Sequence, residues 1–387
     1  MKILFISRGY PTKLEPQLGC FERDQAIALQ KLGHEIIFLS IDCRFALRHK
    51  NKRFGYQYRY EEGFHIYNYG TFIPKILLDV FSTTISYKCF SFILLRLFKR
   101  IIEIHGKPDL LFAHYLSNIV LSKAIKEKYD IPLIGMEHWS QINKDNLSKK
   151  VYSIGSIGYD AVDKLLAVSN ALKNKIKQHF NIYSDVVYNT IGTEFENNTN
   201  NKSKKENFQF VSIGSLFPGK GYDILIKAFA KSNLASKGCK LIIIGQGGEE
   251  KKLRKLIAGY QLAENILLLG KKTKNEIADY LKESHAFVLA SRGETFGVVY
   301  IEAMMFGLPV IATKCGGPEE IVNSDNGVLV AKDNVDELSD ALVNMYNNIG
   351  EYNSELIARQ CYERYSPSQF AKRINKIFEE VLLLNKR

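Results

Sequence analysis

Short apolar runs alternate with segments of helical spacing along the first half of the chain. Residues 21–32 repeat apolar side chains at the helical period and stop before Gly33, a residue type that commonly ends helices. Alternation of strands with helices favours a parallel sheet that is covered by helices on both faces. The strand-like runs are residues 2–7, 35–40, 110–113, 133–136 and 165–168.

A wholly polar segment divides the chain, and the same alternation restarts behind it. Residues 196–206, ENNTNNKSKKE, are typical of a linker between two folded parts. Residues 222–231 have helical spacing, and residues 367–384 form an amphipathic pattern that we expect to return as a helix to the first domain. The strand-like runs of this half are residues 208–213, 240–244, 266–269, 286–289, 309–312 and 327–330.

These patterns predict an α/β protein with two Rossmann-like domains, whose parallel sheets face each other across a cleft. A chain of 387 residues is long for one hydrophobic core, and its 46% hydrophobic and 24% charged residues are ordinary for a globular protein. The predicted parts are a first domain of residues 1–195, a linker of residues 196–206, a second domain of residues 207–365, and a C-terminal helix within residues 366–387.

Cysteine spacing and the apolar segments indicate a cytoplasmic protein. The six cysteines are scattered without a C-x-x-C pair, so neither a zinc site nor a disulfide framework is expected. The apolar run at residues 3–6 is too short for the core of a signal peptide. The most apolar later stretch, residues 76–98, is interrupted by charges and falls short of a membrane span of roughly 20 residues.

Positive charge concentrates in the first hundred residues. They hold 16 Lys and Arg against 8 Asp and Glu, within a net charge of +12 for the whole chain. Such a patch attracts phosphates or anionic lipid headgroups, although a solubilising surface has the same composition. We expect residues 44–100 to contact an anionic membrane peripherally. Nucleic acid is not expected as a partner, because no binding motif accompanies the charge.

Residues 291–303, SRGETFGVVYIEA, carry the chemistry of the second half. The segment follows a buried strand and opens a helix near Gly297, so the free N–H groups of the helix start offer an anion site at the carboxyl end of the strand. Glu294 lies before that site and Glu302 lies about one and a half turns into the helix. A phosphate site with a carboxylate on each side suits a sugar nucleotide. By themselves, two glutamates at this spacing favour a simpler interpretation, in which one is a loop residue and the other is a solvated helix residue.

The residues around the two glutamates make the chain resemble glycosyltransferase family four, which has the two-domain GT-B fold. Residues 294–302 match the E-x7-E signature of that family and continue into Ala303-Met-Met-Phe-Gly-Leu-Pro-Val-Ile-Ala-Thr313, followed by the GGPEEIV of residues 316–322. The resemblance covers nearly the whole chain and is strongest over residues 207–330. It implies a nucleotide-sugar-dependent transferase and says little about the substrate.

The resemblance assigns the donor-binding residues of the second domain. Glu294 would contact the hydroxyls of the donor sugar and take a catalytic role, and Glu302 would bind the ribose. The loop SIGSLFPGKG, residues 212–221, matches the one that supplies an arginine and a lysine to the diphosphate. Lys220 matches the lysine, whereas Ser215 stands where the arginine is usual. Further donor contacts are implied for Thr295, Phe296, Gly297, Val298, Gly270 and Lys272.

In the first domain the resemblance points to a glycine loop and a histidine. Gly19 matches the glycine of the family's loop that faces the acceptor and the diphosphate, and Glu22 and Arg23 follow as cap or surface residues. His138 follows a buried strand and matches the family's catalytic histidine beside the reacting sugar. His114, at the end of another strand, is a weaker candidate, as is Glu137.

The implied reaction moves a hexose from a UDP- or GDP-sugar to a hydroxyl of a lipid-linked or polysaccharide acceptor, as in the synthesis of cell-surface glycans. The family retains the anomeric configuration through same-face attack, in which the donor phosphate takes the acceptor's proton. No D-x-D motif occurs, so we expect no metal and no cofactor, with Lys220 and the helix start stabilising the departing diphosphate. The localisation expected is the cytoplasm, peripherally on the inner face of the membrane.

Rival functions remain open at this point. A nucleotide-sugar epimerase or a phosphorylase has the same fold, and a scaffold that binds sugar nucleotides without turnover would keep most of the motifs. A dehydrogenase on two Rossmann-like domains is disfavoured, because no G-x-G-x-x-G fingerprint follows the first strand.

Overall fold

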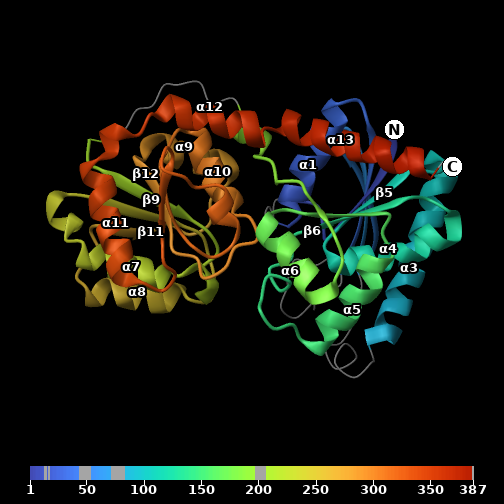
Figure 1. The fold of residues 1–387 in the computed structure, drawn as a ribbon, viewed down its shortest axis with the longest axis horizontal. Coiled ribbons are helices and arrows are strands. Elements are labelled where there is room, and N and C mark those ends of the chain that lie inside the picture. The colour runs from blue at the N-terminus through green and yellow to red at the C-terminus, as the bar shows by residue number, and fades with distance from the viewer. Residues whose placement is uncertain (13–14, 16–17, 43–53, 71–82, 197–205, 386–387) are drawn as a thin grey trace. The chain divides into compact units, whose positions relative to one another are not determined.

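The computed structural model describes residues 1–387 apart from residues 13–14, 16–17, 43–53, 71–82, 197–205 and 386–387. The chain forms two compact units (Figure 1), one of Met1–Thr190 with Pro367–Arg387 and the other of Ile191–Ser366. The division falls after residue 190, whereas the sequence pattern placed the end of the first domain at residue 195. Most of the expected linker lies outside the described residues.

The first unit is built on an eight-stranded sheet in which all pairs except one are parallel. The strand order is β3-β4-β2-β1-β5-β6-β7-β8, and the antiparallel pair is β3 with β4. The strands are β1 (Lys2–Ser7), β2 (Glu35–Asp42), β3 (Gly55–Glu61), β4 (Phe64–Gly70), β5 (Leu110–His114), β6 (Leu133–Glu137), β7 (Lys164–Ala167) and β8 (Asp185–Val186).

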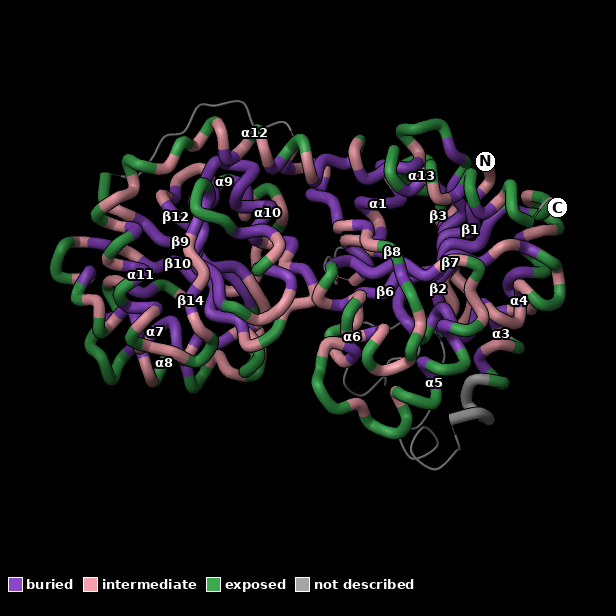
Figure 2. Tube along the Cα trace, in the orientation of Figure 1, coloured by how far each residue is buried: buried purple, intermediate pink, exposed green. Residues whose placement is uncertain are grey.

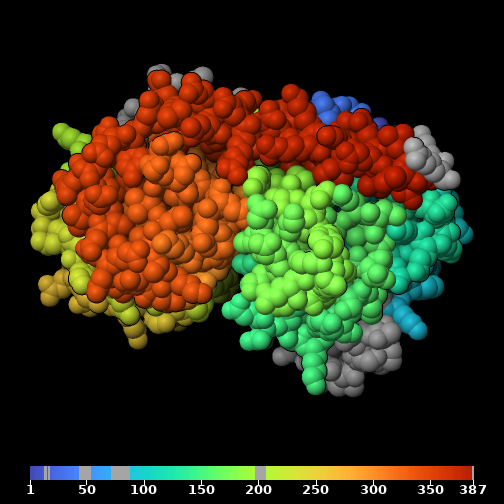
Figure 3. Space-filling model, viewed as in Figure 1, coloured from blue at the N-terminus to red at the C-terminus, as the bar shows by residue number. Residues whose placement is uncertain are grey.

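Helices cover this sheet and bury its central strands. All residues of β5 and β6 are buried (Figure 2), as expected for parallel strands that have a helix layer on each face. The C-terminal helix α13 (Pro367–Leu384) packs against α1, and its Phe378 ring lies 5.2 Å from that of Phe112. Figure 3 shows α13 on the outside of this unit. The other helices are α1 (Cys20–Lys31), α3 (Thr83–His105), α4 (Leu116–Tyr129), α5 (Lys149–Asp160) and α6 (Asn170–Phe180).

The second unit has a six-stranded sheet that is parallel throughout, in the order β11-β10-β9-β12-β13-β14. The prediction of two domains with parallel, Rossmann-like sheets is therefore confirmed. The strands are β9 (Gln209–Ile213), β10 (Lys240–Ile244), β11 (Ile266–Leu268), β12 (Ala286–Leu289), β13 (Val310–Thr313) and β14 (Gly327–Val330). The helices are α7 (Tyr222–Lys231), α8 (Glu250–Gly259), α9 (Lys274–Glu283), α10 (Val298–Met305), α11 (Val335–Asn347) and α12 (Ser354–Tyr365).

β3 and β4 form a hairpin that the apolar pattern does not predict. Its turn, Glu62-Gly63, has positive φ at both residues, which matches the twist of a two-residue hairpin. Three aromatic rungs hold the strands together, and Tyr58 faces Tyr67 with the ring centroids 5.1 Å apart. Because Tyr58 and its neighbours on β3 are half exposed or exposed, the strand lacks the apolar run that marks a core strand.

The stretch expected to meet a membrane is described only in part, since residues 43–53 and 71–82 lie outside the described residues. Among the helices that the structure describes, none is long and apolar enough to cross a bilayer.

Candidate functional site

The order of strands in the second sheet singles out one place on its carboxyl edge. The chain runs from β9 outward through β10 to β11 and then returns to the other side of β9 as β12. At such a reversal the loops after the two central strands diverge, and ligands of open α/β sheets bind in the crevice between them. The loop after β9 carries Lys220, and the loop after β12 carries Glu294.

Lys220 and Glu294 meet at this reversal. Nζ of Lys220 donates to Oε1 of Glu294 at 2.6 Å, although the residues are 74 positions apart in the chain. Ser291 Oγ donates to the same oxygen at 2.6 Å. The side chain of Glu294 is only 11% exposed and that of Lys220 is 29% exposed, so the pair lies partly sheltered at the surface. A carboxylate and an ammonium are thereby held ready for sugar hydroxyls and phosphate oxygens.

The backbone around Glu294 is pinned by the next loop along the sheet. Glu294 pairs with Gly316 as an isolated parallel bridge, and Gly317 N–H donates to the carbonyl of Glu294 at 3.0 Å. A Cβ on Gly317 would lie 2.3 Å from Cα of Phe296, so only glycine permits this approach. The glycine pair recognised in the sequence therefore positions the loop that carries Glu294.

The helix start predicted to bind phosphate is present at α10. Gly297 caps α10 with φ 99°, a left-handed conformation, and as a glycine it offers no side chain to cap the first turn. The N–H groups at this end, beginning with Val298, suit an anion, and the helix dipole reinforces that preference. Phe296 is 1% exposed with its ring 5.7 Å from that of Tyr365, whereas Thr295 is half-buried. Phe296 can thus offer its backbone but not its ring to a ligand.

The remaining predicted donor residues are spread along the same carboxyl edge. Glu302 lies on α10 and is 7% exposed, which leaves little of its carboxylate open to a ribose. Ser215 lies in the loop after β9. Gly270, with φ 70°, follows β11, and Lys272 donates to Glu276 at 3.1 Å in the first turn of α9. Since β11 is the edge strand, these last two lie toward the rim of the site.

Arg292 is a residue of this edge that the sequence patterns did not single out. Its guanidinium donates to Asp333 at 2.6 Å, to Asp223 at 3.0 Å and to the carbonyl of Pro218, and its own N–H donates to Gly219 O at 2.8 Å. It thus ties the loop of Glu294 to the loop of Lys220. Its position inside the motif segment of residues 291–303, two residues before Glu294, was the available signal.

The first unit has a second cluster at the ends of β5 and β6. Nδ1 of His114 and Nε2 of His138 lie 3.0 Å apart, and the two rings are stacked with centroids 5.3 Å apart. His114 is fully buried and its ring stacks on Phe5 at 4.3 Å, while His138 is 8% exposed. Glu137 accepts hydrogen bonds from the backbone N–H groups of His138 and Trp139 at 2.8 and 2.7 Å. Glu137 and His114 therefore both hold His138 in place.

Burial keeps both histidines neutral. Desolvation, reinforced by the charge of Arg8, lowers the pKa of His138 to about 3. Burial first and the neighbouring His138 second lower the pKa of His114 well below its usual range. Burial also raises the pKa of Glu137, although its hydrogen bonds oppose that shift. His138 thus offers a neutral imidazole, which can donate or accept one hydrogen bond to a sugar hydroxyl.

Gly19 and Glu22 frame the loop after β1. Gly19 has φ 72°, and a Cβ there would lie 1.9 Å from the carbonyl oxygen of Gly9, so this glycine is required by the close approach of two backbone segments. Residues 13–14 and 16–17 of the loop lie outside the described residues. Glu22 is 1% exposed and Arg8 pairs with it at 3.4 Å, so Glu22 is not the surface residue that the sequence suggested.

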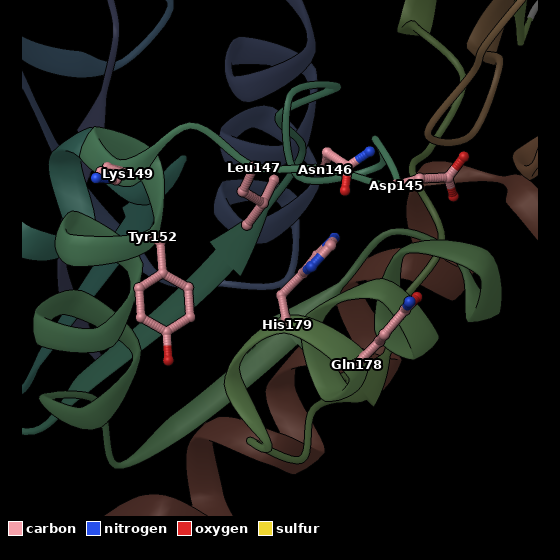
Figure 4. Close-up of a pocket in the computed structure, with 7 residues that line it drawn as sticks. All are labelled: Asp145, Asn146, Leu147, Lys149, Tyr152, Gln178 and His179. Carbon is pink, nitrogen blue, oxygen red and sulfur yellow. The ribbon is translucent and has the colours of Figure 1, made fainter.

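A cavity of about 410 Å³ opens elsewhere on the first unit (Figure 4). Figure 4 shows His179 of α6 pointing toward the loop that carries Asn146 and Leu147. The other lining residues are Asp145, Lys149, Tyr152 and Gln178. None of the predicted site residues lines this cavity. Within the described part of the chain, no group of three or more His, Cys, Asp or Glu side chains is arranged to hold a metal ion.

Comparison with known proteins places the chain among glycosyltransferases. Residues 193–359 match the family described as "Glycosyl transferases group 1", and residues 23–195 match "Glycosyltransferase Family 4". The chain is 30% identical over 294 residues to an uncharacterized glycosyltransferase of Methanocaldococcus jannaschii, covering 73% of this chain and 78% of the relative. It is 25% identical over 293 residues to the N-acetyl-alpha-D-glucosaminyl L-malate synthase of Bacillus anthracis, covering 71% and 75%.

Solved structures share the fold over nearly the full length. The sucrose-phosphate synthase from Thermosynechococcus elongatus superposes with a TM-score of 0.78 at 15% identity, covering 99% of both chains. The Anabaena protein HepE, solved in complex with UDP and glucose, superposes with a TM-score of 0.72 at 18% identity, covering 98% of this chain and 99% of HepE. Together with the sequence matches, these likenesses show that the chain belongs to glycosyltransferase family 4 and is a glycosyltransferase of the GT-B fold.

Proposed function

We propose that this enzyme transfers a hexose from a UDP- or GDP-sugar to a hydroxyl of a lipid-linked or polysaccharide acceptor, in the synthesis of a cell-surface glycan. The observation that carries the donor part is the contact of Lys220 with Glu294, three residues before the α10 start at Gly297, on the β9–β12 reversal. Structures of HepE with UDP and with UDP-glucose support a uridine nucleotide in this fold.

Each donor contact follows from the chemistry of this edge. The N–H groups of the α10 start and the ammonium of Lys220 receive the diphosphate, because both carry positive charge toward the same crevice. Glu294 already accepts hydrogen bonds from Lys220 and Ser291, and it also accepts hydrogen bonds from the hydroxyls of the sugar. Glu302 is 7% exposed in this structure, so its side chain must move outward before it can accept hydrogen bonds from the ribose hydroxyls.

The transfer proceeds with retention and without a metal or another cofactor. Lys220 and the helix start stabilise the negative charge that develops on the departing diphosphate, which is the electrostatic role that a metal has in other enzymes. The acceptor hydroxyl attacks from the face that the diphosphate leaves, and a diphosphate oxygen takes its proton. His138 is the catalytic group contributed by the first unit; its neutral imidazole binds a hydroxyl of the reacting sugar.

The acceptor side of the proposal rests on α3. Its exposed face combines the apolar side chains of Phe92 and Ile104, 60% and 59% exposed, with the exposed charges of Arg96, Lys99 and Arg100. Basic and apolar side chains on one helix suit the surface of an anionic bilayer, where a lipid-linked acceptor would be held. The enzyme would then work in the cytoplasm, on the inner face of the membrane.

Equilibrium binding tests the donor site. Titration calorimetry should show binding of UDP or GDP to the wild type, and the affinity should fall roughly tenfold or more in Lys220→Met. The matched control is Asp336→Asn, which breaks an exposed pair with Lys231 of the same 2.6 Å length. Equal nucleotide affinity in Lys220→Met and the control would overturn the assigned site.

Product analysis tests the reaction. The purified enzyme, incubated with a radiolabelled UDP-sugar and a membrane extract, should transfer the label to an acceptor, and Glu294→Gln should not. Conversion of the sugar without any acceptor would instead show an epimerase, and nucleotide binding without any turnover would show a scaffold.

Vesicle flotation tests the membrane contact. The enzyme should float with vesicles that contain a quarter of phosphatidylglycerol and not with purely zwitterionic ones. The double variant Arg96→Glu and Lys99→Glu should abolish flotation, because it reverses the charge of the α3 face. Flotation that is independent of anionic lipid would contradict this part of the proposal.

A further inference from the structure

The first sheet has a reversal of its own. The chain runs from β1 outward through β2 and later returns to the other side of β1 as β5. The connections that diverge at this point are the loop after β1, which starts at Arg8, and Tyr115, the single residue that joins β5 to α4. Ligands of parallel sheets bind at such reversals, so the side chains found here are candidates for contact with a substrate.

Arg8 is held in a fixed orientation at this reversal. Its guanidinium carbon lies 3.6 Å from the centroid of the Tyr115 ring, and its Nε donates to Oε1 of Glu22 at 3.4 Å. Glu22 is 1% exposed and also accepts from Ser7 Oγ at 3.3 Å. An aromatic face and a buried carboxylate thus orient the guanidinium before any ligand arrives.

The outer edge of the guanidinium is open. The Arg8 side chain is 41% exposed, and within the described part of the chain neither Nη1 nor Nη2 has a hydrogen-bond partner. The two terminal nitrogens form the fork that binds carboxylate and phosphate with two parallel hydrogen bonds. Glu22 is 1% exposed, so its carboxylate is shielded from the solvent side on which a ligand would approach Arg8.

The backbone next to Arg8 is strained. Tyr115 has φ 67° and ψ 143°, which a residue with a side chain rarely adopts. Its N–H donates to Met136 O at 2.9 Å, and its carbonyl accepts from the first turn of α4, so β6 and α4 both hold the conformation. Strain of this kind gathers at functional sites. Here it places the Tyr115 ring beneath Arg8 and 4.9 Å from the ring of His138.

We infer that Arg8 is a substrate-binding residue that receives a phosphate or carboxylate group at the carboxyl edge of the first sheet. The inference rests on the proposed function, because that function brings anionic substrates to this edge. Two sources share the chemistry. One is the donor diphosphate, which lacks the arginine that the family usually supplies at the position of Ser215. The other is an acidic group on the acceptor.

Nucleotide titration separates the two sources. Calorimetry with UDP and no acceptor is run on the wild type, on Arg8→Lys, which keeps the charge and loses the fork, and on the double variant Arg8→Ala and Glu22→Gln, which avoids leaving a buried carboxylate unpaired. The control is Lys177→Ala on α6, since Lys177 lies over the Tyr183 ring at 3.6 Å, the same cation-to-ring distance as Arg8. An affinity that is lower roughly tenfold or more in both Arg8 variants, and unchanged in the control, assigns the donor diphosphate to Arg8.

Small anions test the second source. Inorganic phosphate and succinate are titrated into UDP-saturated protein, where the donor site is occupied, and the rise in melting temperature is followed. A rise in the wild type that both Arg8 variants lose assigns an acidic acceptor group. If UDP affinity and the response to both anions are the same in the wild type and the Arg8 variants, the inference is wrong. If the wild type binds neither UDP nor GDP, the proposed function fails instead, and the anion titrations on the unliganded protein still decide the role of Arg8.

Discussion

The buried pair of His114 and His138 makes the stability of the first unit depend on pH in a defined window. Both imidazoles have a pKa below their usual range, because burial disfavours the charged form. In the unfolded chain a histidine titrates near its ordinary value of about 6.5. Below that pH the histidines bind protons in the unfolded state but stay unprotonated in the native state. The contribution of each histidine is therefore fully present above about pH 6.5 and is lost as the pH falls.

The magnitude follows from the linkage relation. A histidine that stays neutral in the native state lowers the free energy of unfolding by about 2 kcal/mol between pH 7 and pH 5. Glu137 opposes this, since its pKa is raised by burial and a raised carboxyl pKa favours the native state as the pH falls. The dependence of the wild-type free energy of unfolding on pH is thus the difference between the contributions of the histidines and that of Glu137. The change in that dependence when one histidine is removed isolates the contribution of that histidine.

The variant is His138→Gln, whose amide preserves a hydrogen-bonding group opposite Nδ1 of His114. Urea unfolding is followed at pH 7 and pH 5 by the fluorescence of Trp139, the single tryptophan of the chain and the neighbour of His138. This probe reports the first unit even if the two units unfold separately. The variant should lose about 2 kcal/mol less than the wild type between the two pH values.

An equal loss in the wild type and in His138→Gln would refute the reasoning, because it would mean that His138 titrates alike in both states. The His138 ring can also be titrated directly by NMR in the folded wild-type protein. A midpoint near pH 6.5 in that titration would refute the reasoning as well. A catalytic consequence accompanies the expected result: kcat/KM should show no histidine inflection between pH 5 and pH 8, because His138 acts as a neutral group.

Three further predictions concern the donor edge. Lys220→Met should lower kcat/KM roughly a hundredfold in a radiolabel transfer assay, because it removes the cation that faces the departing diphosphate; a change below threefold would contradict this. Ser215→Arg should tighten UDP binding in calorimetry, since it restores a cation that the family usually has there. Gly317→Ala should reduce the free energy of unfolding by about 1–3 kcal/mol in urea titrations, because its Cβ would lie 2.3 Å from Cα of Phe296.

Much of the fold could be predicted from periodicity alone. The predicted strand at residues 240–244 matches β10, and the predicted helices at residues 222–231 and 367–384 match α7 and α13. Buried parallel strands and amphipathic helices have strong local signals, because their environment is uniform along the element. The β3–β4 hairpin escaped prediction, since Tyr58 and Tyr60 of β3 are exposed and this strand carries no apolar run.

The donor residues could be named from motif spacing, but their contacts could not. Glu294 and Lys220 are 74 positions apart, and only the strand order β9–β12 brings their loops together. The sequence also suggested that Glu22 lies on the surface, whereas α1 buries it behind Arg8. A helix residue at such spacing can face either water or the sheet, and the neighbouring loop decides which.

By itself, the sequence determined the fold class, the family and the chemical types at the donor edge, because apolar period and motif spacing are local properties of the chain. The tertiary structure decided which of these residues touch. It placed Ser291 and Lys220 on one oxygen of Glu294, paired His114 with His138, and left the fork of Arg8 open at the reversal beside β1. Contacts of this kind depend on strand order and on loop conformations such as the positive φ of Tyr115. The residues that flank a motif in the sequence determine neither of these.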